Sequence, residues 1–233
     1  MPDTENDKRR SALKLLRFQI LLILGLTAIR GGAQYRVLPG NTDSDGFPMT
    51  PARLCLGATG TAHCYSPPNY MKDAPFGLDP KAQTVAKLNG QELTLFTATF
   101  SDGGSGDLTN FALLTVKNGD LIDILPKVQL TNQSEYKLWK LPQFSPAPIL
   151  VTADFVWDWK AMSASNYREK THLARHRYAI KAFVFDPKTG QDLKRVDFTT
   201  IKKYPGPDEA DEIHVLDPEK LTILAKLQTS QTN

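Results

Sequence analysis

Residues 111–125 read FALLTVKNGDLIDIL, and this stretch decides the fold class. Two apolar runs, 111–116 and 121–125, flank the dipeptide Asn118-Gly119. Asn-Gly is the strongest short signal for a two-residue hairpin turn, so the stretch predicts a β-hairpin. Strands joined by such short turns pair antiparallel, because parallel strands need long crossover connections.

The same pattern extends along the middle of the chain. A second turn sequence, DPKTG at 186–190, separates apolar runs at 178–185 and 193–201. Runs rich in β-branched and aromatic residues predict further strands at 93–100, 136–141 and 149–159. Together these segments predict a mostly antiparallel sheet or β-sandwich of about seven strands.

Two segments carry helix signals. Asp79 and Pro80 suit an N-cap and a first helical position, and Gly90 suits a stop, which predicts a helix over 79–90. Asp217-Pro218, followed by regularly spaced leucines and isoleucine, predicts a second helix near the end. The expected fold class is therefore mainly β with two helices, an α+β arrangement.

The first 33 residues have the order of an export signal. Five Lys or Arg residues between positions 8 and 17 precede an uncharged apolar run at 18–29, and small residues follow at 31–33. That run, at about 1.5 Å per residue, spans roughly 18 Å, well short of a hydrocarbon core of about 30 Å. We expect a signal peptide cut after Ala33. The alternative is an uncleaved anchor at 18–29 with the body outside the cytoplasm.

The charge of the remaining chain excludes two classes of partner. The full sequence has 28 Lys and Arg against 25 Asp and Glu, and the first 33 residues hold six and three of these, leaving 22 of each. A neutral body gives no electrostatic basis for binding nucleic acid or an anionic membrane surface. About 200 residues make one ordinary domain.

The two cysteines, Cys55 and Cys64, are close in sequence. In an oxidising compartment two such thiols pair, so we expect a structural disulfide rather than a thiolate activated by His63 or a zinc site. Residues 34–78 are rich in Pro, Gly, Asn and Asp, which predicts an irregular arm pinned by this disulfide. Residues 79–233 then form the β-rich globular domain.

The stretch 149–159 is the most informative candidate for binding. On a strand, alternate residues share a face, so one wholly apolar face would end in Trp157 and Trp159. This face is interpreted as part of the core. The alternative is an aromatic platform that stacks a sugar ring or a side chain of a partner protein.

The histidines provide a weaker case for catalysis. His172 and His176 lie four residues apart, but no glutamate stands between them, so the zinc-protease pattern is absent. A hydrolase drawing on these two histidines and a nearby carboxylate such as Glu169 is the alternative function. We assign no catalytic residue, no metal site and no cofactor.

Three short sequences are familiar: LFTATF at 95–100, LVTADFVW at 150–157, and HRY at 176–178 before the second turn. Together with the stretch 55–67, the regions 96–125 and 149–204 that hold these strings resemble exported bacterial proteins of unknown function. The resemblance implies export and a shared fold, and it carries no activity.

The function expected from these features is a non-enzymatic binding or interaction module of the cell envelope, secreted or periplasmic. Its partner would be an envelope protein or a saccharide. The oligomeric state is not specified by the sequence.

Overall fold

The computed structural model describes residues 34–57, 59–60, 62–69, 75–88, 90–101, 108–126, 129–132, 135–156, 175–206 and 213–231. Residues Ala33–Asn233 form one compact unit. The predicted leader lies outside the described residues. Among the helices that the structure describes, none is long and apolar enough to cross a membrane.

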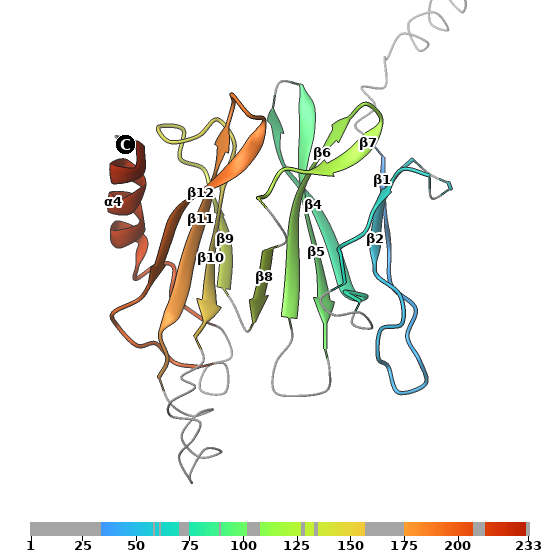
Figure 1. Cartoon of the computed structure of the whole chain (residues 1–233), viewed down its shortest axis with the longest axis horizontal. Coiled ribbons are helices and arrows are strands. Elements are labelled where there is room, and N and C mark those ends of the chain that lie inside the picture. The colour runs from blue at the N-terminus through green and yellow to red at the C-terminus, as the bar shows by residue number, and fades with distance from the viewer. Residues whose placement is uncertain are drawn as a thin grey trace, which may run out of the picture. The chain divides into compact units, whose positions relative to one another are not determined.

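Three antiparallel sheets make up this compact unit (Figure 1). The N-terminal sheet has the order β1-β2-β3, formed by β1 (Tyr35–Leu38), β2 (Arg53–Leu56) and β3 (Cys64–Tyr65). The middle sheet has the order β4-β5-β6-β7, formed by β4 (Leu78–Leu88), β5 (Gln91–Phe100), β6 (Leu108–Lys117) and β7 (Asp120–Asp123), and β8 (Gln129–Asn132) also pairs with β6.

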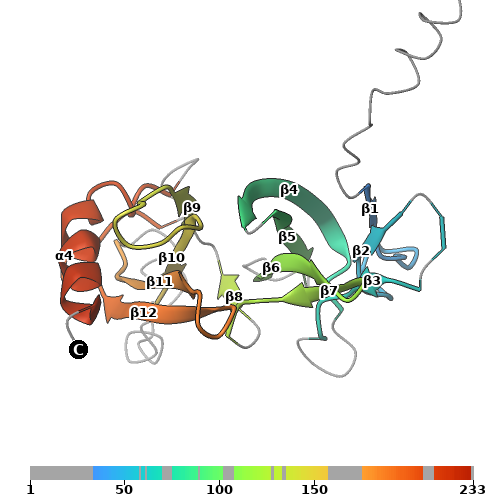
Figure 2. The same cartoon turned by 90° about the horizontal axis from the view of Figure 1, so that it is seen from above.

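The C-terminal sheet has the order β12-β11-β10-β9, formed by β9 (Glu135–Trp139), β10 (Ile149–Phe155), β11 (Tyr178–Asp186) and β12 (Gln191–Thr199). A single described helix, α4 (Lys220–Gln231), covers one face of this sheet (Figure 2). The mainly β, antiparallel character predicted from the hairpins is confirmed.

Both predicted hairpin turns are present. Asn118 and Gly119 have φ values of 54° and 89°, the positive values of a two-residue turn, and they join the paired residues Lys117 and Asp120. The second turn closes between Asp186 and Gln191, and Gly190 supplies its positive φ of 71°. Local turn chemistry therefore fixes the register of two strand pairs.

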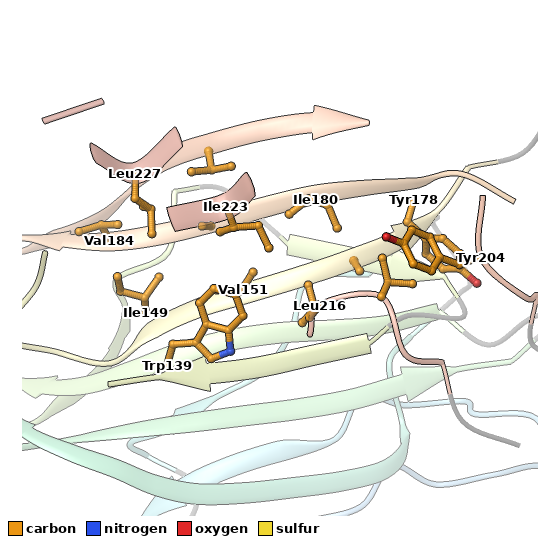
Figure 3. Packing of buried hydrophobic residues seen from close by; sticks show 14 of the residues in the cluster. Trp139, Ile149, Val151, Tyr178, Ile180, Val184, Tyr204, Leu216, Ile223 and Leu227 are labelled. Atoms are coloured by element: carbon orange, nitrogen blue, oxygen red, sulfur yellow. The ribbon is translucent and has the colours of Figure 1, made fainter. Parts of the chain in front are cut away.

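Three hydrophobic cores hold the layers together. The first lies between the C-terminal sheet and α4, where Ile223 and Leu227 of the helix meet Ile149, Ile180 and Val184 of the strands (Figure 3). The second lies between the middle and C-terminal sheets and includes Leu95, Leu113, Leu150 and Phe183. The third lies between the N-terminal and middle sheets and includes Leu54, Phe76, Phe96 and Leu114.

Strand β10 confirms the predicted core face as far as it is described. Ile149, Val151, Ala153 and Phe155 all lie in the core against α4, whereas Leu150 points into the core between the two larger sheets. The strand is central in its sheet and buried on both sides.

The predicted helix at 79–90 is wrong, because these residues form the edge strand β4. Asp79 adopts a positive φ of 43°, and the pairing with β5 shifts between Leu78 and Lys81. A second shift between Thr84 and Ala86 leaves Val85 as an extra residue. Such a bulge breaks the strict alternation of a strand. The apolar residues therefore recur at a spacing that resembles a helix.

The expectations of an irregular arm and of about seven strands also need correction. Residues 34–78 contain the three strands of the N-terminal sheet, and the described residues hold twelve strands and one helix in all. The second expected helix is present as α4, and turns precede it at 216–219.

The loop after β1 docks tightly on the start of β4. The N–H of Gly40 donates to the carbonyl of Gly77 at 2.9 Å. A Cβ on Gly40 would lie 2.0 Å from the carbonyl oxygen of Thr50, so only glycine fits this approach.

Candidate functional site

Most of the sequence-predicted site residues lie outside the described part of the chain: Trp157, Trp159, Glu169 and His172. His176 is described and buried, and it pairs with Tyr204 through reciprocal backbone hydrogen bonds of 2.7 and 2.8 Å. Its ring lies 4.3 Å from the ring of Phe155, centroid to centroid. His176 therefore helps to close the end of the C-terminal sheet.

The two cysteines form the predicted disulfide. Cys55 and Cys64 lie directly opposite each other on β2 and β3, with their Cα atoms 4.0 Å apart. Neighbouring His63 contacts Asp120 at 2.9 Å between Nδ1 and Oδ1, which ties this loop to the β6–β7 turn. The cysteines therefore have a structural role rather than a catalytic one, because the disulfide bond removes the thiolate that a reactive Cys64 would need. Among the described residues, no cluster of three or more His, Cys, Asp or Glu could hold a metal ion.

Two carboxyl groups stand out electrostatically, the half-buried Asp123 and the fully buried Asp192. Asp123 accepts backbone hydrogen bonds from Leu113 and Leu125, each 3.0 Å long, and one from the Tyr65 hydroxyl at 3.5 Å. Burial nevertheless raises the pKa of Asp123 to about 6, because these hydrogen bonds offset the loss of hydration only in part.

The pKa of Asp192 is raised further than that of Asp123. Asp192 is fully buried, and its side-chain oxygens have no hydrogen-bond partner among the described residues. It pairs across the sheet with Phe185, whose ring lies in the core between the two larger sheets. Burial, and then the charge of Asp123, raise the pKa of Asp192 to about 7. With no exposed surface, Asp192 cannot meet a ligand directly, so its role is in stability.

An accessible groove lies between α4 and the β11–β12 hairpin, and we name it the α4 groove. It has a volume of about 400 Å³. Its lining surface is about half polar and half apolar, and the lining residues are Phe144, Val184, Phe185, Asp186, Pro187, Arg195, Leu227 and Ser230. Val184 and Leu227 also belong to the core beneath α4, so the groove floor is continuous with the packed interior.

A β-bulge places Arg195 in the groove. Ala182 pairs with Val196 and Phe183 pairs with Lys194, which leaves Arg195 as the extra residue on β12. Bulges re-aim the side chain of the extra residue and recur next to functional sites. In the part of the chain that the structure describes, no hydrogen bond or ion pair engages the Arg195 guanidinium.

The acidic residue of the groove forms no direct ion pair with this arginine among the described contacts. Asp186 accepts a hydrogen bond from the Lys188 N–H at 3.0 Å and another from the Thr189 hydroxyl at 3.2 Å. Its carboxylate is therefore committed to the hairpin turn. The groove combines the apolar side chains of Phe144, Val184 and Leu227 with a guanidinium that no described side chain pairs directly, a combination that suits a small ligand.

Sequence reasoning missed this site, because its walls come from the loop at 144, the β11–β12 hairpin and α4, which only the fold brings together. Comparisons with protein-family models, characterised proteins and solved structures found no match. The resemblance to exported bacterial proteins stays a prediction, and function is argued here from the groove.

Proposed function

We propose that this chain is an exported, non-enzymatic binding protein whose ligand occupies the α4 groove. The observation that carries the proposal is the combination of apolar lining side chains with the guanidinium of Arg195, which has no hydrogen-bond or ion-pair partner among the described residues. Small-molecule sites are mostly apolar, with a few placed polar groups that orient the ligand.

The chemistry of the lining favours binding over catalysis. The Ser230 hydroxyl donates to the carbonyl of Leu227 at 2.9 Å, and no described base contacts it. Asp186 is held in the turn, and an arginine does not act as a base near neutral pH. The lining thus offers no nucleophile activated by a base, which acyl or glycosyl transfer would need.

Export is supported by the pattern of the first 33 residues and by the disulfide. Disulfides persist in oxidising compartments and are rare in the cytosol. Fractionation of cells expressing the full chain tests this part of the proposal. We expect a shortened protein with oxidised cysteines in the envelope or medium, whereas a full-length cytosolic protein with free thiols would refute export.

Ligand binding is tested with 1-aminoanthracene, a neutral fluorescent probe, on the protein recovered after expression with its own leader. We expect saturable binding at one site. Ser230→Trp should abolish it, because the indole fills the groove. Leu221→Trp is the matched control, since Leu221 lies on the same helix and is 81% exposed.

Circular dichroism establishes that both variants are folded. Absence of saturable binding to the wild-type protein would refute the proposal, and so would equal binding by a folded Ser230→Trp variant.

A further inference from the structure

We infer that the α4 groove binds a small amphipathic monocarboxylate, with its carboxylate on Arg195 and its chain along the apolar wall. The inference rests on the proposed function of the groove and names the class of its ligand. The planar guanidinium offers two parallel N–H donors that match a carboxylate.

The charges that line the groove favour a ligand with a single negative charge. The neighbouring cation Lys194 forms an ion pair with Asp197 on the same strand. Lys226 of α4 lies over the ring of Phe198, with its Nζ 5.0 Å from the ring centroid. Among the described residues that line the groove, Arg195 is thus the one cation, and Asp186 at the hairpin end disfavours a second negative charge on the ligand.

Volume sets the size of the ligand. A water-sized group takes roughly 30 Å³, so the groove, with a volume of about 400 Å³, holds about a dozen non-hydrogen atoms. Decanoate has this size, and its chain can lie against Phe144, Val184 and Leu227. A folded protein partner would need a much larger surface.

A structural role for Arg195 makes a different prediction. Arg195 and Ser230, from the last turn of α4, line the same groove, and a cation at a helix C-terminus is favourable. If the dipole were the whole reason for Arg195, its removal would lower stability and leave ligand preference unchanged.

The experiment compares four straight-chain ligands with ten carbons each: decanoate, decanol, decylammonium and decyl phosphate. Each displaces 1-aminoanthracene from the wild-type protein, Arg195→Gln, Arg195→Lys and Lys188→Gln. Lys188 is the matched control, because it is an exposed cation in the adjacent turn and does not line the groove. Thermal unfolding of each variant is measured in parallel.

We expect the wild-type protein to bind decanoate about tenfold more tightly than decanol, as a charge-assisted pair implies. Arg195→Gln should remove this preference and leave decanol binding intact, and Arg195→Lys should retain part of it. Lys188→Gln should bind like the wild type.

The two proposals fail differently. If no ligand displaces the probe, the groove is not a binding site and both fail. If decanol binds as tightly as decanoate, or Arg195→Gln keeps the preference, the carboxylate inference fails alone. Tighter binding of decyl phosphate or decylammonium than of decanoate would also overturn it.

Discussion

The backbone N–H of Asp192 donates to the carbonyl of Ile124 at 2.7 Å, and this bond joins the C-terminal sheet to the segment that follows β7. The contact brings the start of β12 against the middle sheet, and Asp192 is fully buried there. A charged carboxylate in that position has lost its hydration without gaining a partner, so the protonated form is favoured.

Stability should therefore fall as the pH rises from about 4 to 7. The folded-state pKa values of Asp123 and Asp192 are about 6 and 7, both above the ordinary value of 3.8. Between these limits the folded state binds more protons than the unfolded state, so the free energy of unfolding decreases with pH. Urea unfolding across this range measures the slope.

Asp192→Asn should remove much of this dependence. The amide resembles the neutral acid in shape and cannot ionise, so the variant should exceed the wild type at pH 8 by on the order of 2 kcal/mol. Near pH 4 the two should be similar. Asp197→Asn is the control, because Asp197 lies exposed on the same strand. A slope unchanged by Asp192→Asn would contradict the assignment.

Removing the disulfide should destabilise the N-terminal sheet. The bond closes a loop with a sequence separation of 9, and Cys55 is fully buried. Replacing both cysteines by alanine should lower the free energy of unfolding by roughly 2–3 kcal/mol through greater freedom of the unfolded chain. Differential scanning calorimetry measures the effect, and reduction of the wild type should reproduce most of it. An unchanged melting temperature in both cases would argue against a stabilising bridge.

Glu135 should be essential for holding the segment that precedes α4 against the C-terminal sheet. One carboxylate oxygen accepts the backbone N–H groups of Val215 and Leu216, at 2.6 and 2.8 Å. Both of those residues are fully buried, so Glu135→Ala leaves two donors without a partner and should cost roughly 2–4 kcal/mol.

Chemical denaturation measures this loss, and Glu92→Ala is the matched control. Glu92 forms only a 3.7 Å ion pair with the exposed Lys87, so its removal should cost less than about 1 kcal/mol. Equal effects of the two substitutions would show that the Glu135 contacts contribute little.

Truncating the side chain at two positions on α4 should change stability by very different amounts. Ile223 is fully buried against the C-terminal sheet, whereas Leu221 is 81% exposed. Ile223→Ala should cost roughly 2–5 kcal/mol, because it leaves a cavity in the core, and Leu221→Ala should change stability by less than about 0.5 kcal/mol. Thermal unfolding of the two variants provides the comparison, and a large loss in Leu221→Ala would mean that the helix buries the other face.

The sequence predicted those features whose causes are local. Asn118-Gly119 specifies its turn through the positive φ values that these two residues tolerate. In β10, successive side chains point alternately into two different cores, one on each face of the strand. The segment at 79–90 misled for an equally local reason. Its bulge at Val85 places Val85, Ala86 and Leu88 together against the core between the larger sheets, a spacing typical of helices.

The candidate site depends on long-range placement and could not be predicted in this way. Arg195 is an ordinary exposed residue until the register shift on β12 directs it toward Leu227 and Ser230. Asp192 is likewise unremarkable in the sequence, since its burial depends on a contact with a distant segment: its N–H donates to the carbonyl of Ile124, just after β7.

The covering of the C-terminal sheet by α4 has a consequence for how the chain is made. Ile149 and Val196 are buried beneath Ile223 and Leu227, which are synthesised later. A nascent chain leaving a ribosome or a translocon therefore exposes the apolar face of these strands until the helix has emerged. The C-terminal sheet can therefore complete its packing only after the last residues of the chain have been released.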